Sequence, residues 1–379
     1  MKEDILINLL DEHNEGNLLA TDKFRPCKVI YLKYEENSEL YEKLKKYHKE
    51  IFPSIDIESY IISEGNIKEI NNLLNSLDIE KTIINVTGGK RINSLILLNQ
   101  ALIKKFNIVY IDILNKRIYE LGNDIKNKSE EFKDIYIDDI LKITGSDILL
   151  DSSKISKYSD VINITEKIYK NLELWYKYKQ YLYDNHLFIH DYSQSNKVII
   201  NLSNLYGQEE KRILNSCLNY LEKINAIKYK KSKNDIVVHF QQDYMKGFIF
   251  KSGTWLEVLT NIVVREIEEI DDVKSGVIFL WNNNEIKVKN EFDVLAVKDD
   301  VLICISCKDS AKYDEDALNE LDVYSKRLGG NNAKKILVAT QEPYKRCIKE
   351  RAEMMGISLI ILDKDIEKFK NELKKVINK

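Results

Sequence analysis

The chain has 379 residues, which is too long for a single small module and, at roughly 150 residues per domain, indicates two or three domains. Hydrophobic residues make up 44% of the sequence and charged residues 31%, so the chain can bury a substantial core and is unlike a disordered protein. Its 58 basic and 61 acidic residues give a formal net charge of -3, so any nucleic-acid site must be local.

The five cysteines are odd in number and scattered, which indicates reduced thiols rather than a disulfide framework. Only Cys304 and Cys307 are close together, and they lie within an apolar run. Buried strand cysteines explain this pair better than a redox motif or half of a zinc site.

No apolar run in the sequence approaches the roughly 18 residues that a membrane span needs. The apolar stretch at residues 5–10 is too short for the core of a signal peptide. We therefore expect a soluble, cytoplasmic protein without a membrane partner.

The first third of the sequence alternates short β-branched runs with helical patterns, which is typical of βαβ units and a parallel sheet. Predicted strands occupy residues 5–10, 28–32, 55–62, 82–86 and 108–113. Predicted helices occupy residues 38–51, 67–77 and 90–106. A turn at Asn115-Lys116 leads into a strand at 117–121, and charged, irregular sequence follows. We therefore expect a Rossmann-like α/β domain over residues 1–150.

Two glycines follow the fourth predicted strand, in the sequence Thr87-Gly88-Gly89-Lys90-Arg91, and a helical pattern begins directly after them. Glycine lets the backbone approach a ligand closely, and free N–H groups at a helix start favour an anion. Lys90 and Arg91 add positive charge at the same place. The pattern predicts an anion-binding loop, and an ordinary tight turn is the alternative. The standard dinucleotide and nucleoside-triphosphate motifs do not occur.

Residues 151–245 are rich in Tyr and Lys and helical by pattern, notably at 173–186 and 208–223. The second helix leads into a strand at 224–229, a polar turn and a strand at 236–240. A helix followed by a β-hairpin is the outline of a winged helix. We expect either a winged-helix-like segment or a plain helical linker.

Residues 246–379 show a second α/β pattern, which predicts a separate core. A predicted helix at 254–267 follows Gly253. Predicted strands occupy residues 276–281, 292–297, 301–307, 335–339 and 358–362, and predicted helices occupy residues 315–328 and 344–355. The second and third of these strands are expected to pair as a hairpin.

The hairpin has Asp-Asp at residues 299–300 as its expected turn, a weaker turn signal than Asn-Gly. In that register Asp293 lies opposite Ser306, and Glu291 lies opposite Lys308. Because side chains alternate along a strand, all four lie on one face. A lysine at the end of an apolar run is costly unless it meets a carboxylate or water. One interpretation is an exposed hairpin end with a structural Glu–Lys pair.

The other interpretation is metal-assisted cleavage of a phosphodiester bond. Carboxylates would hold Mg²⁺ or Mn²⁺, and the metal would generate hydroxide and neutralise charge on the scissile phosphate. A lysine would orient the nucleophile or stabilise the developing oxyanion.

Glu257, near the start of the helix before the hairpin, is a candidate further ligand. A helical wheel weakens this assignment, because it places Glu257 on the far side of an apolar face centred on Trp255, Leu259 and Val263. Glu266 lies nearer the apolar centre and is the alternative, as a buried partner for a cation.

With these residues in view, the chain resembles the cyclic-oligoadenylate-activated ancillary nucleases of type III CRISPR systems, the Card/Can family, which join a CARF sensor domain to a PD-(D/E)xK nuclease domain. The resemblance covers essentially the whole length. In the N-terminal part it depends on Ile5-Leu6-Ile7-Asn8-Leu9, Asp11-Glu12-His13-Asn14 and Asn85-Val86-Thr87-Gly88-Gly89-Lys90. In the C-terminal part it depends on Gly253-Thr254-Trp255-Leu256-Glu257, Asn290-Glu291-Phe292-Asp293-Val294 and Ile305-Ser306-Cys307-Lys308.

The resemblance implies a CARF domain over residues 1–150, a linker over 151–245 and a restriction-endonuclease-like α/β nuclease domain over 246–379. Cyclic tetra-adenylate is the expected allosteric activator, and its expected ligands are His13, Asn14, Thr87, Gly88, Gly89, Lys90 and Arg91. The expected catalytic residues are Asp293, Lys308, Ser306 and Glu257. Mn²⁺ or Mg²⁺ is the expected cofactor, held by Asp293, Glu257 and Ser306. The expected partners are a second copy of the chain in a homodimer and DNA, single- or double-stranded, with RNA as a further candidate.

Two positions depart from the family pattern. Ser306 stands where the family has the Glu of its Glu-x-Lys strand, so a neutral hydroxyl replaces a charged ligand and is a weaker partner for hard cations. Lys90-Arg91 replaces Thr-Lys, which keeps the positive charge and shifts its position. The main prediction is an activator-dependent, metal-dependent endonuclease of antiviral defence. The alternatives are a catalytically inactive sensor that binds nucleic acid and a constitutive repair or restriction nuclease.

Overall fold

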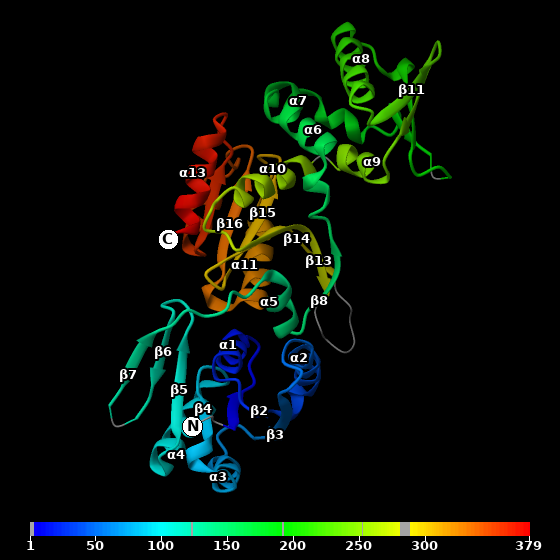
Figure 1. Ribbon diagram of the computed structural model, residues 1–379. Coiled ribbons are helices and arrows are strands. Elements are labelled where there is room, and N and C mark those ends of the chain that lie inside the picture. Colours follow the sequence, from blue (N-terminus) through cyan, green and yellow to red (C-terminus); the bar gives the residue numbers. More distant parts are fainter. Residues whose placement is uncertain (1–3, 123, 192, 252, 281–288) are drawn as a thin grey trace.

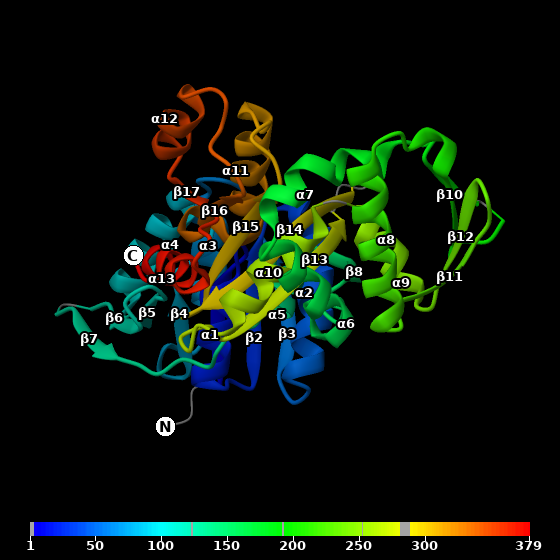
Figure 2. The same cartoon turned by 90° about the horizontal axis from the view of Figure 1, so that it is seen from above.

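The computed structural model describes residues 4–122, 124–191, 193–251, 253–280 and 289–379. The N-terminal part lies at one end of the molecule, the C-terminal part in the centre and the middle segment at the other end (Figure 1). Seen from above, the middle segment projects sideways from the other two parts (Figure 2). None of the described helices is both long and apolar enough to cross a lipid bilayer.

The N-terminal part is a seven-stranded sheet in the order β3-β2-β1-β4-β5-β6-β7. Its strands are β1 (Ile5–Leu9), β2 (Lys28–Lys33), β3 (Asp56–Ile61), β4 (Thr82–Asn85), β5 (Asn107–Asp112), β6 (Arg117–Glu120) and β7 (Lys126–Ser129). The first five strands pair in parallel, and β6 and β7 extend the sheet antiparallel. The predicted Rossmann-like α/β architecture is confirmed.

Helices cover both faces of this sheet. They are α1 (Glu15–Phe24), α2 (Ser38–Ile51), α3 (Ile67–Asn75) and α4 (Arg91–Lys104). The first two pack with Leu6 and Tyr31 on one face, and the other two pack with Ile7 and Leu32 on the opposite face. Helix α1 has no counterpart in the sequence prediction, because its buried side carries polar Asn17 and Thr21 and shows no apolar periodicity.

The C-terminal part is a six-stranded sheet in the order β17-β16-β15-β14-β13-β8. Its strands are β8 (Asp147–Asp151), β13 (Asp272–Leu280), β14 (Lys289–Lys298), β15 (Val301–Lys308), β16 (Lys334–Ala339) and β17 (Ile357–Ile361). Its helices are α5 (Ile137–Ile143), α10 (Thr254–Arg265), α11 (Glu315–Gly329), α12 (Cys347–Met354) and α13 (Ile366–Ile377). The strand predicted at 276–281 ends at Trp281, which lies outside the described residues. Cys304 and Cys307 are buried strand residues, as predicted.

The chain enters the C-terminal sheet before the predicted boundary near residue 150. Strand β8 pairs antiparallel with β13, and α5 contributes Ile137 and Leu141 to the core that contains Val277 and Phe279. The same cluster of buried side chains includes Leu10 and other residues of the N-terminal part, so the two parts share a continuous apolar contact. Helix α5 and strand β8 were not predicted, because both are short and lie in charged sequence.

The β14–β15 hairpin has the predicted register. Its ladder runs from Lys298 opposite Val301 to Val294 opposite Ile305. The two turn residues, 299 and 300, have φ of 51° and 64°, which is the left-handed geometry of a type I′ turn.

The middle segment combines helices with a four-stranded antiparallel sheet in the order β11-β12-β10-β9. Its strands are β9 (Phe188–His190), β10 (Lys197–Asn201), β11 (Ile227–Lys231) and β12 (Asp235–Phe240). Its helices are α6 (Ser159–Tyr169), α7 (Leu172–Tyr178), the 3-10 helix η4 (Lys179–Tyr183), α8 (Gln208–Lys223) and α9 (Asp243–Phe250). Helix α8 leads directly into the β11–β12 hairpin, which is the helix-and-hairpin outline expected from the sequence.

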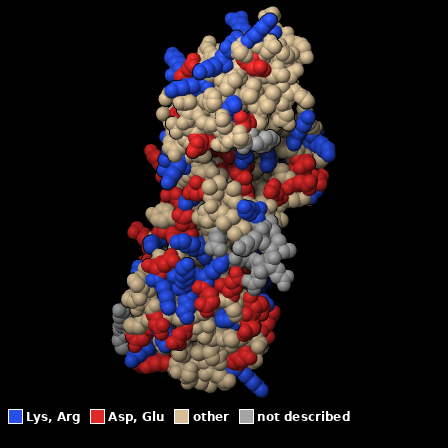
Figure 3. Space-filling view, turned by 90° about the vertical axis from the view of Figure 1, so that its right-hand side faces the viewer, with Lys and Arg blue, Asp and Glu red and all other residues tan. Residues whose placement is uncertain are grey.

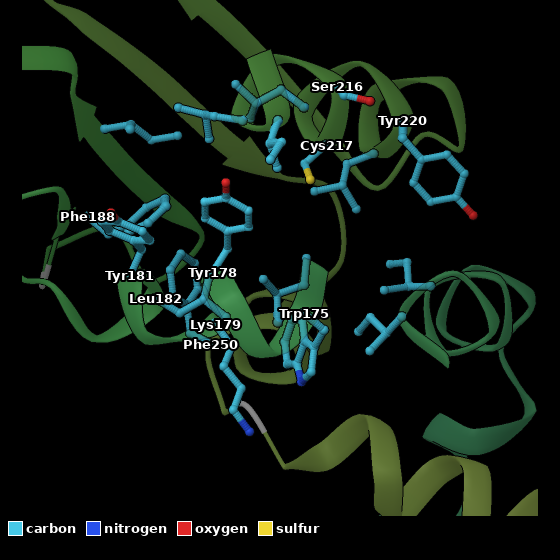
Figure 4. A pocket seen from close by; sticks show the side chains of 18 of the residues that line it. Trp175, Tyr178, Lys179, Tyr181, Leu182, Phe188, Ser216, Cys217, Tyr220 and Phe250 are labelled. Carbon is cyan, nitrogen blue, oxygen red and sulfur yellow. The ribbon is translucent and has the colours of Figure 1, made fainter. Parts of the chain in front are cut away.

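Inside the middle segment is a cavity of about 470 Å³, lined largely by apolar and aromatic side chains of α7, α8 and the sheet (Figure 4). On the outside, the face seen in Figure 3 shows acidic and basic side chains interspersed over the N- and C-terminal parts. The middle segment is largely uncharged on this face, with basic side chains along its edge. This distribution agrees with a near-neutral chain whose basic groups are local.

Candidate functional site

Glu257 lies on α10 and is only 8% exposed, although it is a charged residue. The helix packs against β13, β14 and β15 on one side and against α6 and α9 on the other. Its position on the helical wheel nevertheless does not expose Glu257, which lies close enough to Asp293 and Lys308 of the hairpin for their charges to act on it. The alternative of Glu266 as a buried partner is wrong, since Glu266 is exposed and pairs with Lys370 at 3.1 Å.

Asp293 lies where the regular ladder of the hairpin ends. At this position its Oδ2 accepts the backbone N–H of Cys307 at 2.6 Å and the hydroxyl of Ser306 at 3.2 Å. The carboxylate thus takes the place of a backbone partner. The predicted juxtaposition of Asp293 and Ser306 on one face is present.

The two carboxylates and one lysine form an electrostatically linked group. Burial raises the pKa of Asp293. Burial, together with the negative charge of Asp293, raises the pKa of Glu257. The positive charge of Lys308 opposes both increases. A buried and a half-buried carboxylate so close together are costly unless positive charge lies beside them, so this group favours a cation.

Glu291 pairs with Lys251 rather than with Lys308, its predicted partner across the hairpin. The distance from Glu291 Oε1 to Lys251 Nζ is 3.1 Å. Lys251 directly follows α9, and its charge also opposes the rise in the pKa of Glu257. Lys251 was not predicted from the sequence, because only the packing of α9 beside α10 brings it to the hairpin.

The oxygen donors at this place are the kinds that Mg²⁺ and Mn²⁺ prefer. They are the carboxylates of Glu257 and Asp293 and the hydroxyl of Ser306. Within the described ranges, no three His, Cys, Asp or Glu side chains come together as a metal site. This arrangement agrees with the departure seen in the sequence, in which Ser306 replaces a third carboxylate.

The Gly-Gly loop between β4 and α4 packs tightly against the end of β1. A Cβ atom at Gly88 would lie 3.0 Å from the backbone oxygen of Leu9, and one at Gly89 would lie 2.7 Å from Leu9 Cβ. Gly89 also has φ of 85°, a conformation that favours glycine. Close approach of the two chain segments therefore requires both glycines.

A carboxylate of the chain itself accepts a hydrogen bond from the backbone N–H of Gly89 in this loop. Asp11, in the loop after β1, accepts the Gly89 N–H with its Oδ2 at 2.8 Å. Its Oδ1 accepts the N–H of Glu12 at 2.7 Å. The Gly89 N–H thus donates to a side chain of the chain itself in this structure, and anion binding by the loop stays a prediction.

A network of hydrogen bonds among buried asparagines supports the Gly-Gly loop. Asn85 Oδ1 accepts the N–H and the hydroxyl of Thr87 at 3.1 and 2.5 Å. Asn85 Nδ2 donates to Asn8 Oδ1 at 3.0 Å and to Asn17 Oδ1 at 3.1 Å. Sequence analysis missed this network. The available signal was an asparagine inside each of two apolar strands, which is costly without partners.

The remaining basic residues of the loop differ in their surroundings. Lys90 Nζ lies 2.8 Å from Glu64 Oε2 and 4.4 Å from the centre of the Tyr34 ring. Arg91 is the first residue of α4 and is exposed. Both side chains therefore lie at the surface beside the Gly-Gly loop.

His13 and Asn14 are engaged where the N-terminal and C-terminal parts meet. Asn14 is fully buried, and its Nδ2 donates to Asp11 O at 2.6 Å and to Ile143 O at 3.1 Å. The His13 ring packs against Gly330 after α11, where a Cβ would lie 3.3 Å from the ring. The structure therefore gives both residues a role in joining the two parts, and their role as activator ligands stays a prediction.

Comparison with known proteins matches residues 245–378 to the family model described as "Card1-like, endonuclease domain". No curated protein sequence matches the chain.

Three solved structures are similar in fold. Protein VC1899 from Vibrio cholerae has a TM-score of 0.74 at 20% identity, covering 99% of this chain and 97% of its own. Can2 from Sulfobacillus thermosulfidooxidans, solved with cyclic tetra-adenylate, has a TM-score of 0.69 at 20% identity, covering 100% and 98%. A type III CRISPR defence DNA nuclease activated by cyclic oligoadenylate has a TM-score of 0.51 at 12% identity, covering 93% of this chain and 52% of its own. The C-terminal part of this chain thus matches the Card1-like endonuclease domain model, and the whole chain shares its fold with VC1899 and Can2.

Proposed function

We propose that the protein is a metal-dependent endonuclease that cleaves DNA when a cyclic oligoadenylate binds its N-terminal domain. The observation that carries this proposal is the group formed by buried Glu257 with half-buried Asp293 and Lys308, in the region that matches the Card1-like endonuclease model. The similar structures support it further, since one holds cyclic tetra-adenylate and another is a DNA nuclease activated by cyclic oligoadenylate.

Glu257 and Asp293 would hold Mn²⁺ or Mg²⁺, with Ser306 as a neutral third donor. When bound, the metal would neutralise charge on the scissile phosphate and activate a water molecule. Asp293 is already fixed by the Cys307 N–H, so its carboxylate is oriented before any cation arrives. Lys308, beside the pair, would stabilise negative charge that develops on the phosphate oxygens.

The activator would bind at the Gly-Gly loop as an anion. Its phosphates would face the N–H groups of Gly88 and Gly89 and the side chains of Lys90 and Arg91. Because the Gly89 N–H already donates to Asp11, a phosphate bound there would have to displace the Asp11 carboxylate. The adjacent Glu12 pairs with Arg327 of α11 at 3.1 Å, so movement of this loop would reach the nuclease domain.

We further propose that the protein acts as a two-fold homodimer, in which a cyclic ligand would contact the Gly-Gly loops of both copies. Ligand binding would then change how the two nuclease domains face each other. Single- and double-stranded DNA are both candidate substrates, and RNA is a further one.

The test of this function is plasmid cleavage with Mn²⁺ in the presence of cyclic tri-, tetra- or hexa-adenylate, alongside calorimetric binding of each ring. Cleavage that needs one of these ligands would support the proposal. Cleavage without any ligand would instead indicate a constitutive nuclease. Binding without cleavage would indicate a catalytically inactive regulator, the alternative that Ser306 favours.

The exchange of Ser306 for Glu is expected to strengthen the metal site. The Ser306 hydroxyl lies 3.2 Å from Asp293 Oδ2, so a carboxylate at this position would stand beside the proposed metal ligands. Added negative charge increases the affinity of an oxygen site for Mg²⁺ or Mn²⁺. We expect Ser306→Glu to bind Mn²⁺ about tenfold more tightly, as roughly 1.4 kcal/mol would give, and to cleave faster, above all with Mg²⁺.

The matched control for this exchange is Ser306→Gln, which adds similar bulk without charge. Calorimetry with Mn²⁺ and cleavage assays at several Mg²⁺ concentrations measure the difference. If Ser306→Glu has unchanged metal affinity or cleaves more slowly, other groups already complete the metal shell and Ser306 is not a weakened ligand.

Charge changes at the Gly-Gly loop are expected to have opposite effects on activator binding. Asp11→Asn keeps an oxygen that can accept the Gly89 N–H but removes a negative charge that an arriving phosphate would meet. Like charges a few ångströms apart near a protein surface repel by about 1 kcal/mol or more, so binding should tighten about fivefold.

Lys90→Ala should weaken binding and lower its salt dependence, because a positive charge near phosphate is lost. Calorimetry at two salt concentrations measures both, and weaker binding by Asp11→Asn would show that Asp11 mainly organises the loop.

A further inference from the structure

Asp309 is a buried carboxylate that the proposed chemistry does not use. It directly follows Lys308, the last residue of β15, and its side chain is only 3% exposed. A carboxylate buried to this degree requires hydrogen-bond donors or a cation around it. The identity of those donors therefore shows what holds this end of the catalytic strand.

Both carboxylate oxygens of Asp309 are fully used. Oδ2 accepts the indole N–H of Trp175 at 2.7 Å and that of Trp255 at 3.0 Å. Oδ1 accepts the hydroxyl of Thr340 at 3.1 Å and lies 3.1 Å from Lys179 Nζ. Four donors thus converge on one side chain, and charge-assisted hydrogen bonds of this kind are the stronger and more directional ones.

Two of these donors come from elements of the nuclease domain that frame the catalytic group. Trp255 lies on α10, two residues before Glu257. Thr340 follows β16, and its backbone N–H donates to Lys308 O at 3.0 Å. Asp309 therefore connects the helix that carries Glu257 with the strand end that carries Lys308.

The other two donors come from the middle segment. Trp175 lies on α7 and Lys179 on η4, and both border the cavity of that segment. Figure 4 shows the nitrogen atoms of both side chains at the same end, pointing away from the cavity. The two tryptophan rings also meet edge to face, with centroids 6.3 Å apart. The middle segment is thus attached to the nuclease domain at the residue next to Lys308.

We propose that Asp309 is a positioning residue, which sets the place of Lys308 relative to Glu257 and does so only while α10 and the middle segment are both docked on it. The inference rests on the proposed nuclease function. It adds that the middle segment is part of the catalytic machinery, because loss of its contacts to Asp309 displaces the strand end that carries Lys308. A displacement of about 1 Å at a reacting group can lower a rate about a hundredfold.

The test compares two variants that each remove one hydrogen bond to Asp309 with one that removes its charge. Trp255→Phe and Trp175→Phe keep an aromatic ring and remove the N–H donor from α10 or from the middle segment. Asp309→Asn removes the charge from all four contacts. The matched control is Tyr176→Phe, on the same helix as Trp175, which removes a 3.3 Å hydrogen bond to Thr340 O and leaves all four donors to Asp309 in place. Each variant is assayed for cleavage of plasmid DNA with Mn²⁺ and activator, well below its melting temperature.

We expect Trp175→Phe, Trp255→Phe and Asp309→Asn each to lower kcat about tenfold or more, with KM for DNA and the calorimetric affinity for activator within about twofold of wild type. Tyr176→Phe should keep a kcat close to wild type. A wild-type kcat in Trp175→Phe would overturn the inference, because the middle segment would then not position the site. An equal loss in Tyr176→Phe would also overturn it, since general docking of α7 would explain the effect. If Asp309→Asn does not fold, the two tryptophan variants decide. A wild-type protein that does not cleave at all contradicts the proposed function instead.

Discussion

Replacing Asp293 with Ala is expected to lower DNA cleavage at least about a thousandfold, while the affinity for the activator stays within about twofold. A bound metal contributes several kcal/mol of charge stabilisation, and about 4 kcal/mol corresponds to a thousandfold change in rate. Asp293 and Glu257 are the proposed carboxylate ligands, and Ser306 offers no negative charge to replace Asp293. Plasmid cleavage with Mn²⁺ and activator, together with calorimetric binding of the activator, measures both quantities.

The control for this prediction has to separate the charge of Asp293 from its structural contact. Its Oδ2 holds the Cys307 N–H at 2.6 Å, so Asp293→Ala also removes a support of the hairpin. Asp293→Asn keeps an oxygen acceptor for that N–H and removes only the charge. We expect Asp293→Asn to be about as inactive as Asp293→Ala, with thermal stability nearer that of wild type.

Lys308→Ala should abolish cleavage without weakening Mn²⁺ binding in calorimetry, because the lysine is not a ligand and its positive charge opposes a cation beside it. Cleavage that survives Asp293→Ala would place the chemistry elsewhere in the chain. Cleavage that survives Lys308→Ala but not Asp293→Ala would leave the metal site in place and remove the role proposed for the lysine.

The sequence predicted the hairpin at the centre of this site well, because local rules determine it. Alternation places Asp293 and Ser306 on one face, and the turn at residues 299–300 fixes the register. Those two turn residues adopt positive φ without a glycine. Contacts from distant segments stabilise them, since Lys116 Nζ lies 2.5 Å from Asp299 Oδ1 and Asp300 Oδ1 accepts the Ile135 N–H at 2.8 Å.

Features that depend on distant segments could not be predicted from the sequence. Glu257 looks peripheral on a wheel of its own helix, yet it is buried and forms a group with Asp293 and Lys308, which a hairpin later in the chain brings to it. Helix α1 lacked a clear apolar stripe because its buried residues include Asn17, which belongs to an asparagine network, beside the core residues Leu18 and Leu19. The contact between Asp11 and Gly89 joins two loops that are far apart in sequence. In each case tertiary packing determines the environment of a polar residue, and the periodicity of the local sequence does not predict that environment.

Replacing Gly88 with Val is expected to weaken activator binding at least about a hundredfold while the nuclease domain stays folded. A Cβ at Gly88 would lie 3.0 Å from the Leu9 backbone oxygen and 3.4 Å from Asn17 Nδ2, and the two methyl groups of valine would need still more room. The loop would have to move away from β1, which would disturb the Gly89 N–H and block the approach of a phosphate to the backbone.

The matched control is Gly122→Val in the same part of the chain, because the nearest atom to a Cβ there is 3.8 Å away and Gly122 has no left-handed backbone angle to maintain. Calorimetry with cyclic tetra-adenylate measures affinity, and hydrogen exchange over β1, β4 and β5 shows whether the sheet stays intact. Loss of binding with an intact sheet locates the activator at the Gly-Gly loop. Binding unchanged from wild type would locate it elsewhere, and the Asp11 carboxylate would then be a structural cap of the loop, because no ligand would compete with it for the Gly89 N–H.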